Sequence, residues 1–213
     1  MIRKTCSWIP VAAVALLVLA SCSRENPGKA NPSGSASPSE NGSASSQVVP
    51  GKDDEGRSKA PVVQSPLDGS KFIADPCLSL TQSQLQRFEV SQQGQRSEDQ
   101  NGVGCRWRFG SEGATSAAVS YLPKVENGLS NLYALNDSGF WRDGYFEPTE
   151  VEGYPAVYNS VADQRAQGSC GMAVGINDRL MFSVLISDRP GRDVCKAAGN
   201  FATAVVQTIK GGQ

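Results

Sequence analysis

The chain has 213 residues, with 20 basic and 21 acidic side chains and a formal net charge of −1. This balance, without any basic run, gives no electrostatic support for nucleic acid binding. The sequence contains no histidine, which excludes Ser-His and Cys-His catalysis and removes the commonest metal ligand. We find no serine-hydrolase, P-loop or dinucleotide-binding motif. We therefore expect no metal and no cofactor.

The first 21 residues have the organisation of a lipoprotein signal peptide. Arg3 and Lys4 precede an apolar stretch at 9–19, which is shorter than the ~20 residues that a membrane-spanning helix needs. The stretch ends in Leu19-Ala20-Ser21-Cys22, which resembles a lipobox. Cys22 is predicted to carry the lipid, with palmitate among its acyl chains, and to hold the protein on the outer face of the cell membrane. The alternative is an ordinary signal peptide cleaved near Cys22 without lipid.

Residues 22–71 are rich in Ser, Gly, Pro and Asn, and they contain no aromatic residue. Such a segment buries too little surface to offset the entropy of ordering, so it is predicted to be a disordered tether. Residues 72–213 then form one domain of about 140 residues, a common domain size.

The first half of this domain predicts a helix followed by two strands. Thr81 and Gln84 form a capping box that opens the helix. Apolar and polar side chains alternate beyond it, as in half-buried strands. In chain order, we expect a helix at 81–89, a polar loop at 91–104, and strands at 105–109 and 115–122.

The second half predicts a short helix, a strand, a hairpin and a final helix. Asn127 is a possible cap for the short helix through 129–135, and a strand is expected at 156–158. Asn177-Asp178 separates the two hairpin strands, and Asp193 can cap the last helix. The apolar stripe of that helix is Val194, Ala198, Phe201, Val205 and Ile209. This order indicates an α+β fold with a single antiparallel sheet and helices packed on one face.

Four cysteines fall in the predicted domain. An even number in an exported domain favours two disulfides over a zinc site, whose ligands usually come in closely spaced pairs. Adjacent pairing joins Cys77 to Cys105 and Cys170 to Cys195, so that each bond clamps a helix start to the sheet. The main alternative joins Cys77 to Cys195 and Cys105 to Cys170.

Two groups of side chains offer a site, and each also has a structural interpretation. Glu147, Glu150 and Glu152 suggest carboxylate catalysis, but three acids close together beside a proline are more often a solvated face. Six aromatic residues either line a ligand cleft or belong to the core, which is the more common role. They are Trp107, Trp141, Tyr145, Phe146, Tyr154 and Tyr158.

The ordered motifs resemble the actinobacterial lipoproteins that share domain of unknown function 3558. The resemblance covers nearly all of 72–209, and the lipobox and polar tether are typical of the family too. It implies a small α+β envelope domain with two disulfides, and the family supplies no catalytic residues. The motifs are Asp75-Pro76-Cys77 before the T-x-x-Q helix, Cys105-Arg106-Trp107, Val151-Glu152-Gly153-Tyr154-Pro155-Ala156, Cys170, and Cys195-Lys196-Ala197-Ala198.

These observations predict a monomeric, membrane-anchored domain that is not an enzyme. We expect it to bind a small apolar ligand or to assist another envelope protein. A cell-wall-directed hydrolase or transferase that uses acidic residues is the alternative, and a structural partner of another envelope protein is the third possibility.

Overall fold

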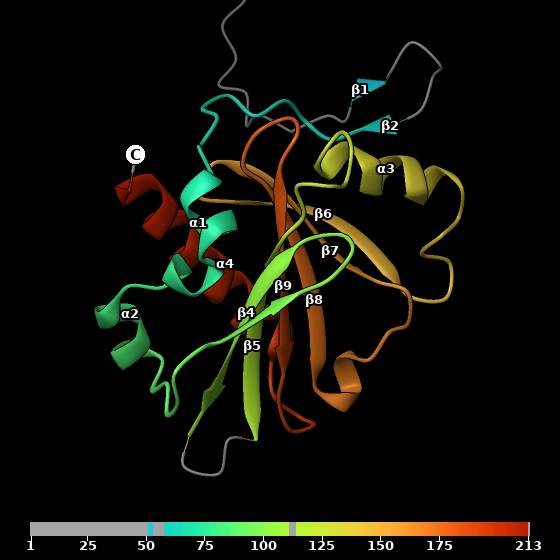
Figure 1. Cartoon of the computed structure of the whole chain (residues 1–213). Helices are drawn as coiled ribbons and strands as arrows, with labels where there is room; N and C mark the ends of the chain where they lie inside the picture. The colour runs from blue at the N-terminus through green and yellow to red at the C-terminus, as the bar shows by residue number, and fades with distance from the viewer. Residues whose placement is uncertain (1–50, 53–57, 111–113, 213) are drawn as a thin grey trace, which may run out of the picture. The chain divides into compact units, whose positions relative to one another are not determined.

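The computed structural model describes residues 51–52, 58–110 and 114–212 (Figure 1). All of them lie within one compact unit, residues 45–213. The predicted signal peptide, Cys22 and most of the predicted tether lie outside the described residues. No helix in the described ranges is long and apolar enough to span a membrane.

The centre of the domain is a seven-stranded sheet in the order β3-β4-β5-β9-β8-β7-β6, in which every neighbouring pair is antiparallel. A separate pair joins β1 (Gly51–Lys52) to β2 (Ser58–Lys59). The sheet strands are β3 (Gln95–Glu98), β4 (Val103–Phe109), β5 (Thr115–Tyr121), β6 (Tyr145–Val151), β7 (Tyr154–Ser160), β8 (Ser169–Gly175) and β9 (Met181–Ser187).

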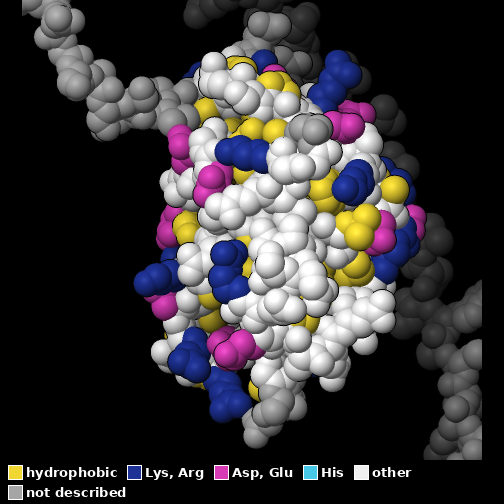
Figure 2. Space-filling view, turned by 90° about the vertical axis from the view of Figure 1, so that its left-hand side faces the viewer, with side chains coloured by type: hydrophobic (Ala, Val, Ile, Leu, Met, Phe, Trp, Pro, Cys, Tyr) yellow, Lys and Arg dark blue, Asp and Glu magenta, His cyan; other side chains and the backbone are white. Residues whose placement is uncertain are grey.

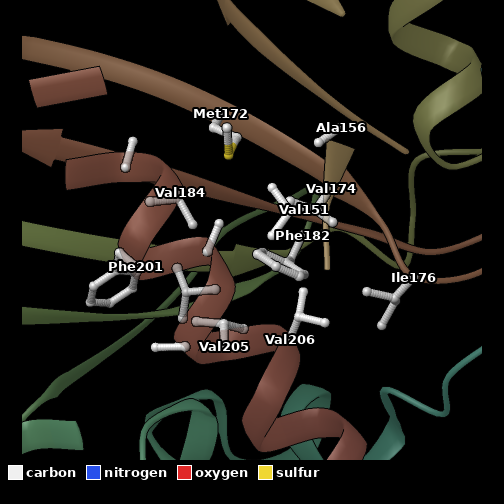
Figure 3. Packing of buried hydrophobic residues seen from close by; sticks show 14 of the residues in the cluster. Val151, Ala156, Met172, Val174, Ile176, Phe182, Val184, Phe201, Val205 and Val206 are labelled. Carbon is white, nitrogen blue, oxygen red and sulfur yellow. The ribbon is translucent and has the colours of Figure 1, made fainter. Parts of the chain in front are cut away.

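The longest helix, α4 (Val194–Gly211), packs its apolar stripe across the sheet. The Asp193 carboxylate accepts the backbone N–H of Lys196 at 3.0 Å, as the N-cap prediction requires. All five predicted stripe residues are buried. Figure 3 shows Phe201, Val205 and Val206 of this helix beside Phe182 and Val184 of β9.

The remaining helical segments are short. They are α1 (Ser70–Ala74), the 3₁₀ turn η1 (Pro76–Ser79), α2 (Gln82–Arg87), α3 (Leu129–Asp137) and the 3₁₀ turn η2 (Arg165–Gln167).

The α+β class, the antiparallel sheet and the two disulfides are confirmed, but the helices cover both faces of the sheet. The face that bears α4 carries the larger core cluster. On the opposite face, Leu129, Leu132 and Tyr133 of α3 pack with Val157 and Ala173 of the sheet in a second cluster. Figure 1 shows α3 on the far side of the sheet from α1 and α4. The expectation of helices on one face is therefore corrected for α3. The apolar residues of α3 cover Val157, Ala173 and Met181, so this part of the second face is also buried.

The capping box of α2 forms as predicted, and it also joins two helices. Thr81 Oγ1 accepts the N–H of Gln84, and Gln84 Oε1 accepts the N–H of Thr81. Gln84 Nε2 then donates to Ala204 O at 2.9 Å, while Thr208 Oγ1 donates to Gln84 Oε1 at 2.8 Å. The buried amide of Gln84 thus fixes α2 against α4.

The predicted Asn127 cap of α3 is wrong. Gly128 occupies the N-cap position, without a side-chain hydrogen bond, and Asn127 lies just before it at φ 62°. Glycine is needed at position 128 because the backbone passes close to Arg179 there. A Cβ on Gly128 would lie 2.9 Å from the Arg179 carbonyl carbon, and its φ of 48° also favours glycine.

The sequence placed the start of the domain at Phe72, but the folded part begins earlier in the chain. Val63 and Leu67 are 5 % and 8 % exposed and belong to the larger core cluster. The N–H of Leu67 donates to Ile176 O at 2.8 Å, and Tyr154 Oη donates to Ser65 O at 2.8 Å. The C-terminal end of the predicted tether is therefore part of the domain.

Candidate functional site

Both disulfides join the predicted cysteines. Cys77 in η1 is bonded to Cys105 on β4, and Cys170 on β8 is bonded to Cys195 in the first turn of α4. Each bond therefore clamps the start of a helical segment to a strand. The zinc alternative is excluded, because all four sulfur atoms are bonded in pairs.

A hollow of the described surface lies beside α2, and we call it the α2 groove. It has a volume of about 690 Å³ and lies between η1, α2 and the segment 90–96. Its volume is within the range of small-molecule sites, roughly 300–1,000 Å³. The lining combines four exposed amides with apolar side chains: Gln82, Gln86, Gln92 and Gln93, with Leu78, Leu85 and Val90.

The lining of the α2 groove includes Trp107, which is only 1 % exposed. In the described part of the chain its indole N–H donates to no acceptor, whereas Trp141 Nε1 donates to Leu132 O at 3.3 Å. Among the described residues, every polar side-chain atom sealed from solvent has a partner. The indole N–H of Trp107 must therefore reach solvent, and it does so at the groove. A buried tryptophan usually pairs this group, so the unpaired donor is available to a ligand.

The segment before β3 passes very close to Trp107 and the first disulfide. A Cβ built on Gly94 would lie 2.6 Å from Trp107 Nε1 and 2.6 Å from Cys105 Sγ. Only glycine fits at this point without a shift of the neighbouring groups. Gly94 therefore lets the chain approach the nitrogen edge of the indole and form one wall of the groove.

A second hollow of about 550 Å³ lies on the other side of α2, next to the end of α4. The two hollows share Cys77, Leu78, Gln82 and Leu85. Leu78 is 47 % exposed. The short helix α2 and the turn η1 therefore form a ridge with a hollow on each flank.

A smaller apolar cleft of about 290 Å³ lies where α4 meets the ends of β4, β5 and β9. It is lined mainly by Phe88, Phe109, Ile186, Ala197 and Phe201. Its volume is at the lower limit of small-molecule sites.

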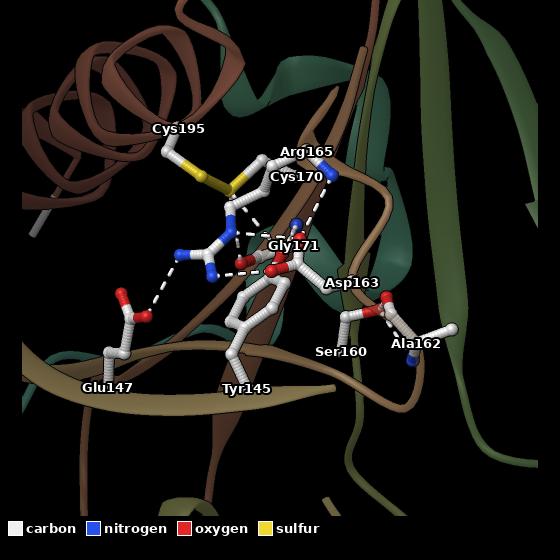
Figure 4. Close-up of polar contacts among 9 residues, drawn as sticks. All are labelled: Tyr145, Glu147, Ser160, Ala162, Asp163, Arg165, Cys170, Gly171 and Cys195. Atoms are coloured by element: carbon white, nitrogen blue, oxygen red, sulfur yellow. Dashed lines mark hydrogen bonds and ion pairs between the residues drawn. A yellow bond between two sulfur atoms is a disulfide. The ribbon is translucent and has the colours of Figure 1, made fainter. Parts of the chain in front are cut away.

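Among the described residues, a polar cluster surrounds Arg165 (Figure 4). Its guanidinium donates to Glu147 at 2.8 Å and to both carboxylate oxygens of Asp163 at 2.9 and 2.6 Å. It also lies 4.2 Å above the ring of Tyr145. Hydrogen bonds from Arg165 lower the pKa of the Asp163 carboxyl. Because Nε, Nη1 and Nη2 of Arg165 all donate to these two carboxylates, the cluster holds η2 against β6 and its cation is already paired.

The glutamates considered for catalysis do not converge. They lie on or beside β6, an edge strand, and all three are exposed. Glu147 pairs with Arg165, and Glu152 accepts from Gln207 Nε2 at 3.1 Å and lies near Lys210. Their arrangement is that of a solvated face.

The six aromatic residues belong to the core. Trp107, Trp141, Tyr145 and Tyr154 are buried, and Phe146 and Tyr158 are half-buried against the two core clusters. Of the six, only Trp107 also lines the α2 groove. The sequence did not single out the groove glutamines, because glutamine on a polar surface carries no distinctive pattern.

Fold and groove together define a disulfide-bonded α+β domain with an open groove lined by both amides and apolar side chains. In comparison with known protein families, residues 17–208 match the model described as "Protein of unknown function (DUF3558)". The chain belongs to this family. No curated protein and no solved structure gives a significant match.

Proposed function

We propose that this protein is an actinobacterial lipoprotein that acts as a non-catalytic binding protein of the cell envelope and holds its ligand in the α2 groove. The observation that carries the proposal is the unpaired indole N–H of Trp107, which meets a groove of about 690 Å³. The groove lining mixes amides with apolar side chains. We therefore propose a neutral, hydrogen-bonding ligand in place of the apolar one suggested by the sequence.

The lipid anchor rests on the sequence around Cys22. The family match begins at residue 17, so it includes this cysteine and the polar segment after it. A diacylated cysteine anchors a protein stably, because each buried CH₂ contributes ~0.8 kcal/mol. The polar segment would then hold the domain away from the lipid surface.

Cys22→Ala should release the protein from the membrane fraction or leave its signal peptide uncleaved. The physical reason is that the acyl chains provide the attachment and the alanine cannot carry them. Fractionation and intact-mass measurement of the envelope-expressed protein check this. Cys6→Ala is the matched control, since Cys6 lies in the segment predicted to be removed. Normal processing and full membrane retention of the Cys22→Ala protein would contradict the anchor.

Trp107→Phe should abolish retention of the groove ligand while keeping the domain folded. Phenylalanine keeps an aromatic ring in the core but has no N–H to face the groove, and it also leaves a small void where the indole is larger. Native mass spectrometry of the full chain purified from its envelope should show a bound molecule in the wild type and not in the variant.

Trp141→Phe is the control for indole removal, because its N–H is satisfied within the protein. Equal retention by all three proteins would place the ligand outside the α2 groove. A wild-type protein that carries no ligand, and that takes up none from an envelope extract, would contradict the binding function.

A further inference from the structure

We propose that the α2 groove binds a chain of N-acetylated sugars and that an acetamido carbonyl accepts the indole N–H of Trp107. This inference rests on the proposed function, because it names the ligand class of the same groove.

The bottom of the groove selects a slender acceptor. Trp107 is 1 % exposed, so only a narrow group reaches its nitrogen. Indole is a donor only, and it therefore needs an acceptor oxygen. The Cys77 end of the disulfide, Leu85 and Val90 line the same groove and offer apolar contact. An acetamido group brings a carbonyl oxygen and a methyl group on one small planar unit, which matches both requirements.

The basic residue of the groove lining is already paired within the protein: Arg96 lies 2.9 Å from Glu98. The Asp75 carboxylate accepts the backbone N–H of Cys77 at 3.1 Å, which orients it but leaves its negative charge in place. Figure 2 shows acidic and basic side chains interspersed over the side of the domain that carries α2, with broad uncharged areas between them. The groove lining therefore offers no unpaired cation to an acidic ligand and is compatible with a neutral one.

The upper walls of the groove suit hydroxyl groups. Gln82, Gln86, Gln92 and Gln93 are exposed, and each amide both donates and accepts hydrogen bonds, as sugar hydroxyls do. The second hollow shares Gln82 and Leu85 with the groove, so a ligand long enough to cross the ridge at α2 would contact both hollows. An oligosaccharide fits this continuity better than a single sugar.

An extended peptide is the main competing occupant, and the neighbouring edge strand opposes it. A peptide would gain most of its binding by adding a strand to β3. That strand has four residues and carries the Arg96–Glu98 ion pair. Short, charged edges are the usual protection against strand addition.

NMR of the full chain tests the inference through the indole N–H resonances of Trp107 and Trp141, assigned with the two Trp→Phe variants. Chitotetraose should move the Trp107 indole resonance downfield in a saturable way and leave that of Trp141 in place. Cellotetraose, which has the same linkage but no acetamido groups, should produce no saturable shift. Gln82→Leu with Gln86→Leu should weaken chitotetraose binding by about tenfold, through the loss of two modest hydrogen bonds.

Three results would overturn the inference: no saturable shift with chitotetraose, an equal shift with cellotetraose, or a shift only with N-acetyl-tetraalanine amide. The last of these would identify a peptide as the occupant. If chitotetraose fails while the wild type still carries an envelope molecule that Trp107→Phe loses, only the ligand class is wrong. If both measurements fail, the proposed binding function fails with it.

Discussion

Replacing Cys170 and Cys195 together with alanine should lower the free energy of unfolding by about 3–4 kcal/mol. The two cysteines are 25 residues apart, and the chain-entropy model assigns a stabilisation of this size to a closed loop of that length. The bond fixes the first turn of α4 to β8, which lies between β9 and β7 in the sheet. Domains are typically stable by about 5–15 kcal/mol, so the variant should remain folded but melt roughly 10 °C lower.

Denaturant unfolding of the double variant and of the wild type measures this loss. The wild type with reductant present throughout should approach the stability of the variant. The variant also loses the contact of Tyr145 Oη with Cys170 Sγ at 3.5 Å. Tyr145 Oη still accepts the N–H of Gly171 at 3.1 Å, so this contributes little. The Cys77–Cys105 pair, 28 residues apart, supplies a second case that should give a similar loss. A loss below about 1 kcal/mol in both pairs would mean that the bonds do not restrict the unfolded chain.

The spacing of apolar residues along the chain correctly predicted those helices and strands that bury one continuous apolar face. The helix α4 was found because Val194, Ala198 and Phe201 begin a stripe with helical spacing, and the β8–β9 hairpin because its apolar residues alternate. The disulfide pairing was also predicted from local information, because each bond joins the start of a helical segment to a strand that is close in the chain.

Edge strands escaped prediction because they have no continuous buried face. All four residues of β3 are exposed, so no apolar alternation marks the segment within what was expected to be a loop. In β6 only Tyr145 and Val151, at the two ends, are buried. Pro148 in the middle of β6 suggested a loop, although proline is tolerated on an edge strand.

The domain start and the α2 groove depend on contacts between distant parts of the chain. Val63 and Leu67 stand alone in a polar segment, and only their contacts with the β8–β9 end of the sheet make them part of the core. Alternation along β4 correctly placed Trp107 in the core. The alternation gave no indication that the indole N–H of Trp107 would lack a partner. That depends on which groups lie around the indole in the folded chain, and Gly94 is one of them.

Phe201→Ala should lower the free energy of unfolding by about 3–5 kcal/mol, the usual cost of removing a buried phenylalanine ring. Phe201 is 2 % exposed, and its ring centroid lies 5.7 Å from those of both Trp107 and Phe88. The cavity would remove the support behind Trp107, so the variant should also bind the groove ligand less tightly. Lys196→Ala, at an exposed site on the same helix, is the control and should change stability by less than about 0.5 kcal/mol.

Chemical unfolding of both variants measures the difference. A loss for Phe201→Ala as small as that of the control would show that the aromatic cluster is not a packed part of the core. A normal affinity for the ligand in the destabilised protein would show instead that Trp107 keeps its position without Phe201.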